Sequence, residues 1–225
     1  MTRLVYLPGI DGTGRLLHRQ PRLLAEYDVR CISYPQHDAQ TYDSLADMGE
    51  AALGSEGGIV LAESFGGAVA LTLALRRPDL VRQLVLVNTF AHYPRGPLIT
   101  LLSYVGPYLP KRASPAFSRK LRGKVFFPPC TPQAEQDEWW DRTGDVPLSA
   151  YGIRLKLIAG IDLRERLPDI SAPTTVFVSP NDHVVPPPAG RLLAKRIPNA
   201  TLIERPAGHA AMISPLVDVA TWLER

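Results

Sequence analysis

Short apolar runs alternate with longer segments of helical length over most of the chain. The runs are rich in β-branched residues and are bounded by glycine, proline or polar residues, which is the pattern of buried strands. This pattern predicts strands at residues 4–7, 29–33, 59–61, 81–87, 174–178 and 200–204, and helices at residues 16–25, 44–53 and 68–75. Such alternation predicts an α/β fold with a mostly parallel, doubly wound sheet and helices on both faces.

The alternation stops between residues 91 and 168, where no convincing strand pattern occurs. Segments at residues 97–105, 132–142 and 149–161 have the length and composition of helices instead. The strand pattern resumes at Thr174. We therefore expect a largely helical insertion ahead of the fifth strand.

Ser64 lies where an apolar strand ends and an apolar helix begins, within the segment Ala62–Gly67. A serine on such a tight turn projects its hydroxyl above the sheet, and the free N–H groups of the new helix point at what it attacks. Gly66 and Gly67 are the small residues that this close approach requires. Glu63 is expected to point into the interior and to be hydrogen-bonded there. A plain strand–glycine–helix junction with a surface serine fits the same residues, so this motif alone does not decide.

Two further polar residues follow predicted strands near the end of the chain. Asp182 follows the strand at 174–178, and His209 follows the strand at 200–204. Because the carboxyl ends of parallel strands meet at one edge of the sheet, we expect Ser64, Asp182 and His209 to converge there. A serine needs a base to take its proton, and that base needs an orienting carboxylate. The three residues therefore form a candidate nucleophilic triad.

A glycine-rich loop, Gly9–Gly14, follows the first predicted strand. Its glycines let the backbone approach a substrate closely and direct N–H groups inward. The N–H groups of Ile10 and Phe65 are the candidate oxyanion hole. A phosphate-binding loop is the competing interpretation, but the glycine spacing does not match either common phosphate motif.

Four segments together resemble the α/β-hydrolase superfamily in its serine esterase or thioesterase form. Residues 7–10 resemble the oxyanion motif with Pro8 in place of histidine, and residues 62–66 resemble the nucleophile turn with Ala62 in place of glycine. Residues 181–186 resemble the acid loop of the superfamily, and residues 208–209 resemble its Gly-His base. The resemblance covers nearly the whole chain. It implies that Ser64, Asp182 and His209 are catalytic.

The resemblance also implies a domain layout. Residues 1–90 and 169–225 correspond to the α/β-hydrolase core, and residues 91–168 correspond to a helical cap inserted in it. Within this cap, Trp139, Trp140 and His92 are candidate substrate contacts that would shape an apolar acyl pocket. Packing of cap against core is the alternative role for the tryptophans.

Basic residues gather in the predicted cap. No Asp or Glu occurs between Leu80 and Ala134, whereas Arg119, Lys120, Arg122 and Lys124 lie close together there. A solvated basic face explains such a cluster. The alternative is a docking patch for an acidic partner, such as an acyl carrier protein or a coenzyme A-linked substrate.

Composition limits the remaining classes. The chain has 225 residues, 45% of them hydrophobic and 21% charged, which suits one globular α/β domain. The formal net charge of +3 is modest and no recognition motif accompanies it, so nucleic acid is not expected as a partner. No transmembrane segment or leader is expected, which favours a cytoplasmic location. Two cysteines give no disulfide framework, and neither a metal site nor a cofactor is expected.

These features predict a serine hydrolase that cleaves a carboxylic ester through an acyl-enzyme on Ser64. A small-molecule acyl ester is the expected substrate, with a carrier-linked acyl ester as one form of it. A thioesterase or acyltransferase acting on acyl-CoA or acyl-carrier substrates is the alternative within enzymes, and peroxidase chemistry uses the same residues. A small-molecule receptor or a scaffold on the same fold is the alternative outside enzymes.

Overall fold

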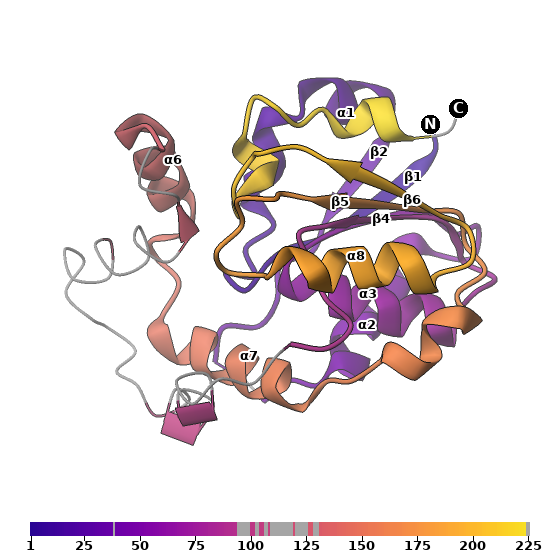
Figure 1. Cartoon of the computed structure of the whole chain (residues 1–225), viewed down its shortest axis with the longest axis horizontal. Helices are drawn as coiled ribbons and strands as arrows, with labels where there is room; N and C mark the ends of the chain where they lie inside the picture. Colours follow the sequence, from indigo (N-terminus) through magenta and orange to yellow (C-terminus); the bar gives the residue numbers. More distant parts are fainter. Residues whose placement is uncertain are drawn as a thin grey trace.

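Six parallel strands form one sheet at the centre of the molecule, in a computed structural model that describes residues 1–37, 39–93, 100–101, 104–105, 108, 119, 126–127 and 131–223 (Figure 1). The order across the sheet is β2-β1-β3-β4-β5-β6. The bounds are β1 (Arg3–Leu7), β2 (Asp28–Cys31), β3 (Gly58–Glu63), β4 (Val81–Val87), β5 (Thr174–Val178) and β6 (Ala200–Glu204). Each predicted strand is present, and those at 81–87, 174–178 and 200–204 have the predicted bounds.

Side chains of the central strands point alternately to two faces, and each face has its own apolar core. In β1, Val5 and Leu7 pack in one cluster of buried residues, whereas Leu4 and Tyr6 pack in the other. Burial on both faces explains why these strands are continuous apolar runs rather than alternating ones.

Helices cover both faces of the sheet, as Figure 1 shows. One face carries α2 (Tyr42–Leu53), α3 (Phe65–Arg76) and α8 (Pro187–Arg196). The other carries α1 (Pro21–Glu26) and three short 3₁₀ helices, η1 (Arg15–Arg19), η4 (Ala211–Ile213) and η5 (Val219–Trp222). The predicted α/β class with helices on both faces is confirmed.

The single helix predicted at residues 16–25 is wrong. The structure has η1 and α1 in its place, separated at Gln20. Pro21 has no N–H group to continue a helix and disfavours helical backbone at the preceding residue, so it starts a new helix instead. The Gln20 side chain then fixes the break, because its amide donates to the carbonyls of Met212 and Val217.

Between β4 and β5 the described elements are helical: α6 (Gln133–Thr143), α7 (Leu148–Gly160) and the 3₁₀ helix η3 (Arg164–Asp169). The first two match the helices predicted at 132–142 and 149–161. Glu138 of α6 pairs with His18 and Arg19 of η1. These ion pairs attach α6 to η1, which packs on one face of the sheet. The helix predicted at 97–105 falls largely outside the described residues. The division into a core and a cap at residues 91–168 stays a prediction.

The direction in which strands are added to the sheet reverses between β1 and β3. From β1 it moves outward to β2 and then returns to the other side of β1. In open α/β sheets this reversal separates the loops at the carboxyl ends of the two central strands and leaves a crevice there. The loops after β1 and β3 carry Ile10 and Ser64 respectively, so the topology brings both to that crevice.

Candidate functional site

Ser64 is the link between β3 and α3 and has a left-handed backbone, with φ 52° and ψ −120°. Its N–H donates to the Val87 carbonyl at 2.9 Å, and its carbonyl accepts from the Gly67 N–H at 3.0 Å. A Cβ on Gly66 would lie 2.3 Å from the Leu7 carbonyl oxygen, which is closer than any real contact. A non-glycine residue with positive φ, held by these bonds, is typical of strained functional turns.

Asp182 and His209 form a buried hydrogen-bonded pair. Asp182 Oδ2 lies 2.8 Å from His209 Nδ1, while Oδ1 accepts from the N–H groups of Val184 and Val185 at 2.7 and 3.0 Å. Burial by itself lowers the pKa of the His209 imidazole, but the Asp182 carboxylate and Glu63 outweigh it and raise that pKa above its ordinary value. The arrangement leaves Nε2 of His209 as the ring nitrogen available for chemistry.

Asn88, at the end of β4, holds the two loops that carry this pair. Its side-chain amide donates to the carbonyls of Gly208 (2.7 Å) and His209 (3.2 Å), and its oxygen accepts from the Ser179 N–H at 2.8 Å. Ser179 in turn accepts from the Asp182 N–H at 3.0 Å. Asn88 also has a positive φ of 46°. This residue therefore sets the position of both the acid loop and the base loop.

The Ile10 and Phe65 N–H groups remain the candidate oxyanion hole: Phe65 directly follows Ser64 in the chain, and Ile10 lines the same cavity as the serine. Neither N–H donates a hydrogen bond to any residue that the structure describes. Phe65 is the first residue of α3, where N–H groups have no partner within the helix. The Gly9–Gly12 turn is closed by the Gly12 N–H donating to the Gly9 carbonyl at 3.0 Å. A Cβ on Gly9 would lie 3.6 Å from Ser64 Cβ, so the loop passes close to the serine.

Ser64 and His209 line one small cavity of about 20 Å³, which has room for about one water molecule. The Phe126 ring stacks on the His209 ring with centroids 5.8 Å apart. Ser64 and His209 are both described, and the Ser64 hydroxyl makes no hydrogen bond to the His209 ring. In enzymes without substrate, the hydrogen bond between nucleophile and base is often long and tightens only when substrate binds. The lining residues are Gly9, Ile10, Asp11, Leu16, Glu63, Ser64, Phe126, Trp139, His209 and Ala210.

Glu63 is buried beside the serine, and its expected hydrogen bond is confirmed: it accepts from the Tyr6 hydroxyl at 2.9 Å. Burial raises the pKa of this carboxyl to about 7, with His209 opposing the rise and Asp11 adding to it. A second ionisable carboxyl therefore lies within electrostatic reach of the His209 imidazole.

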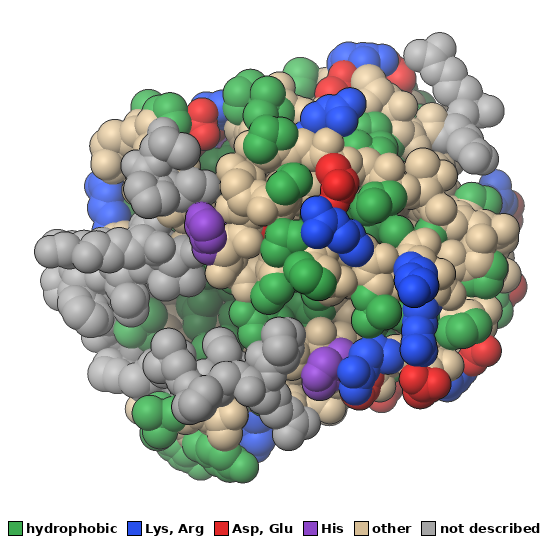
Figure 2. Space-filling view, viewed as in Figure 1, with side chains coloured by type: hydrophobic (Ala, Val, Ile, Leu, Met, Phe, Trp, Pro, Cys, Tyr) green, Lys and Arg blue, Asp and Glu red, His purple; other side chains and the backbone are tan. Residues whose placement is uncertain are grey.

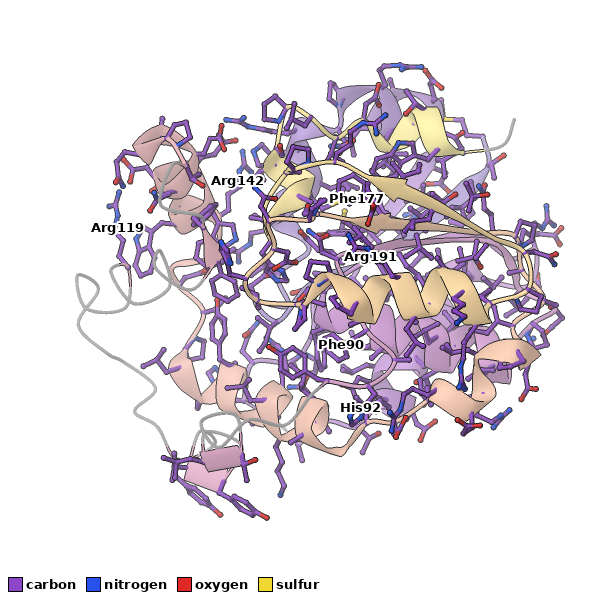
Figure 3. All side chains as sticks on the ribbon, viewed as in Figure 1. Phe90, His92, Arg119, Arg142, Phe177 and Arg191 are labelled. Carbon is purple, nitrogen blue, oxygen red and sulfur yellow. The ribbon has the colours of Figure 1, made fainter. Side chains whose placement is uncertain are left out.

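The candidate cap residues have different positions. Trp139 lines the cavity and packs against Phe126 and Phe127, with ring centroids 5.1 and 5.8 Å away. Trp140 packs at the edge of the same apolar cluster and does not line the cavity. His92, also a candidate substrate contact, does not line it either. Its ring lies 3.3 Å from the Ile161 carbonyl, between the end of β4 and the segment after α7 (Figure 3).

The proposed basic patch is described only at Arg119, which is half exposed and pairs with Asp137 of α6 (Figure 3). Lys120, Arg122 and Lys124 lie outside the described residues. On the face shown in Figure 2, the described basic and acidic side chains are interspersed rather than gathered by sign. Pairs such as Arg191 with Glu204 explain this mixture.

Sequence reasoning missed two residues, Asn88 and Arg154. Asn88 directly follows β4, and a polar residue at the carboxyl end of a parallel strand is a sequence feature that indicates a role at the site. Arg154 lies in a helix that was expected for its apolar content, and the structure buries its side chain completely. A lone arginine in an apolar helix was the available hint.

Cys31 is exposed at the end of β2. No group of three or more His, Cys, Asp or Glu side chains within the described ranges is arranged to hold a metal ion. None of the helices that the structure describes combines the length and apolarity that a membrane span requires.

Comparison with known proteins places the chain in a family. The model of the alpha/beta hydrolase family matches residues 4–222. The candidate carbamate hydrolase RutD of Caulobacter sp. (strain K31) is 30% identical over 193 residues, covering 83% of this chain and 70% of that protein. The pimeloyl-(acyl-carrier protein) methyl ester esterase of Nitrosomonas europaea is 30% identical over 208 residues, covering 85% of this chain and 82% of that protein.

The fold agrees with these matches. The crystal structure of a hydrolase from Pseudomonas aeruginosa PA01 superposes with a TM-score of 0.80 at 23% identity, covering 93% of this chain and 83% of that one. The predicted resemblance is therefore confirmed, and the chain belongs to the alpha/beta hydrolase family.

Proposed function

We propose that this protein hydrolyses a carboxylic ester through an acyl-enzyme on Ser64. The observation that carries the proposal is the buried Asp182–His209 pair, whose ring lines the same small cavity as the serine. The N–H groups of Ile10, which lines that cavity, and of Phe65, which follows Ser64, support it further, because neither donates to a residue that the structure describes.

The geometry supports a two-step reaction. His209 Nε2 takes the Ser64 proton as the serine oxygen attacks the acyl carbon, and the Ile10 and Phe65 N–H groups bind the developing oxyanion. Asp182 fixes the His209 tautomer and stabilises the imidazolium. His209 then gives the proton to the departing alcohol, and a water activated by the same imidazole releases the acid.

The names of relatives support an ester as the substrate class. One of them is named as a methyl ester esterase, and another as a carbamate hydrolase candidate. Both names describe attack on a carbonyl with loss of an oxygen or nitrogen group. That chemistry needs a nucleophile, a base and oxyanion donors, the roles proposed for Ser64, His209 and the Ile10 and Phe65 N–H groups.

Substitution of the serine tests the proposal. Ser64→Ala is expected to lower kcat for p-nitrophenyl butyrate by at least about three orders of magnitude, because the nucleophile is lost. Ser55→Ala, at an exposed serine before β3, is the matched control and should leave kcat unchanged. Retention of turnover in folded Ser64→Ala would refute the assignment. A receptor would instead turn over once, slowly, and retain the product, without steady-state turnover.

A carrier-linked acyl ester is the second candidate, favoured by the relatives named for an acyl-carrier substrate. Charge reversal at Arg119, Lys120 and Arg122 is then expected to raise KM for a carrier-linked ester and not for a small ester. Equal effects on both substrates would contradict a docking role for these residues.

A further inference from the structure

Arg154 lies on α7 with its side chain fully buried, and it is the largest side chain so placed among the described residues. Removing a charge from water is costly unless hydrogen bonds replace the lost hydration. The hydrogen-bond partners of the guanidinium therefore identify the segments that Arg154 holds in place.

Those partners are mainly backbone carbonyls of two loops. Nη1 donates to the carbonyls of Ile10 at 2.7 Å and Asp11 at 2.9 Å. Nη2 donates to the Pro35 carbonyl at 2.9 Å, and Nε approaches the Gln40 side-chain oxygen at 3.4 Å. One side chain thus connects α7 to the loop after β1 and to the loop after β2.

The fit around the guanidinium is close. A Cβ on Gly12 would lie 2.5 Å from Arg154 Cζ, so only glycine leaves room for the guanidinium there. The Tyr34 ring covers the guanidinium, with its centroid 5.6 Å from Cζ. The Tyr34 N–H also donates to the Gly12 carbonyl at 2.8 Å, which ties the two loops together.

These bonds fix the orientation of consecutive peptide units. The Gly9 carbonyl is held by the Gly12 N–H, and the next two carbonyls are held by Arg154. In a trans peptide the N–H points away from the carbonyl of the preceding residue. The Ile10 N–H shares a peptide unit with the Gly9 carbonyl, and the Gly12 N–H that holds this carbonyl shares its own peptide unit with the Asp11 carbonyl held by Arg154. The Ile10 N–H therefore cannot rotate without straining or breaking one of these bonds.

We propose that Arg154 is a positioning residue that aligns the Ile10 N–H beside Ser64 by holding the carbonyls of Ile10 and Asp11. The inference rests on the proposed function, because it takes this N–H as a donor to the oxyanion. Arg154 itself touches no reacting atom. Its effect falls on the transition state, since the oxyanion forms only there.

Two variants test this role from opposite sides of the contact. Arg154→Lys keeps the charge and loses the fork that reaches two carbonyls. Gly12→Ala displaces the guanidinium from the loop side and also strains a position with φ 68°. Lys156→Met, at an exposed residue on the same helix, is the matched control.

For p-nitrophenyl butyrate, both variants are expected to lower kcat by about 10- to 100-fold with KM within about twofold, a smaller loss than deletion of an oxyanion donor. Affinity for a trifluoromethyl ketone, which forms a tetrahedral adduct on serine, should fall by the same factor. Affinity for the product carboxylate should not change. Amide hydrogen exchange in residues 9–14 should accelerate in both variants and not in Lys156→Met.

Folded Arg154→Lys with unchanged kcat, ketone affinity and loop exchange would overturn the positioning role while leaving Ser64 chemistry intact. Faster loop exchange with unchanged kcat and ketone affinity would overturn it as well, since the loop would then not need this anchor for catalysis. A wild-type protein that turns over no ester and forms no adduct would overturn the proposed function, and this role with it.

Discussion

The side-chain amide of Asn88 donates a 2.7 Å hydrogen bond to the carbonyl of Gly208, which joins the end of β4 to the residue before His209. The other end of the same amide accepts from the Ser179 N–H at 2.8 Å, at the start of the loop that carries Asp182. A residue without a direct chemical role thus determines how the acid and the base meet.

Loss of this amide is expected to reduce both activity and stability. Asn88→Gly tolerates the positive φ and leaves buried backbone groups of Ser179 and Gly208 unpaired, which costs about 2 kcal/mol of unfolding free energy. Misplacement of His209 should lower kcat by about 10- to 100-fold. Denaturant unfolding and ester turnover measure the two effects. Asn199→Gly, at an exposed asparagine, should change neither by a comparable amount, and equal effects would contradict the assigned role.

Gly66, the last residue of the nucleophile turn, is expected to be irreplaceable. In Gly66→Ala the new methyl group would meet the backbone carbonyls of Leu7 and Pro8 at 2.3 and 2.4 Å, and backbone cannot swing aside as a side chain can. We expect a loss of about 3 kcal/mol or more in unfolding free energy, together with loss of turnover. In Gly160→Ala, at the end of α7, nothing lies within 4 Å of the added Cβ. That control should be neutral or stabilising by up to about 1 kcal/mol.

The pH dependence of turnover should report the His209–Asp182 pair. The base must be neutral to accept the Ser64 proton, and its pKa is raised because Asp182 and Glu63 together outweigh the effect of burial. kcat/KM is therefore expected to rise with pH through an inflection above 6.5, the ordinary value for histidine. In Asp182→Asn the histidine resonance followed by NMR should titrate at lower pH than in the wild type. An unchanged titration would contradict the coupling.

Glu63 should make stability depend on pH in the opposite sense to a carboxylate whose pKa is lowered in the folded protein. Its pKa is about 7 in the folded protein, chiefly because it is buried, and 4.5 is the ordinary value that applies to the unfolded chain. Between these values the folded state binds more protons, so the unfolding free energy falls as pH rises, by up to about 3 kcal/mol.

Glu63→Gln removes that penalty. Its stability relative to the wild type should therefore be greater at pH 8 than at pH 4, as measured by urea unfolding. Glu56→Gln, at an exposed glutamate, is the matched control and should differ from the wild type by a constant amount. A constant difference for Glu63→Gln would show that burial does not raise the pKa of Glu63 above its value in the unfolded chain.

The strands and the convergence of the candidate site could be predicted from the sequence, because both follow from local patterns. Val81–Val87 and Thr174–Val178 are apolar runs with clear ends, and polar residues after parallel strands necessarily meet at one edge. The break at Gln20 was missed although Pro21 signals it, since the apolar periodicity on both sides suggested one helix.

What could not be predicted depends on contacts between distant segments. The bonds from Arg154 to Ile10 and Asp11 join residues more than 140 positions apart, and nothing local to either segment indicates the other. His92 is a candidate substrate contact in the sequence, but the structure pairs it with Asp162 in an antiparallel β-bridge, and it does not line the cavity. Packing determines where the side chains of a long connection point, and the hydrophobic periodicity of the sequence does not predict that packing.

The cavity that Ser64 lines has room for about one water molecule, which is less space than an acetyl group needs. An ester therefore reaches the serine only if aromatic neighbours such as Phe126 and Trp139 move, and that rearrangement costs free energy for small and large acids alike. A long acyl chain regains it through its own apolar contacts, whereas acetate regains little. Selectivity for larger acids would then arise from the free-energy cost of moving these aromatic side chains, and it would require no pocket that matches the length of the acyl chain.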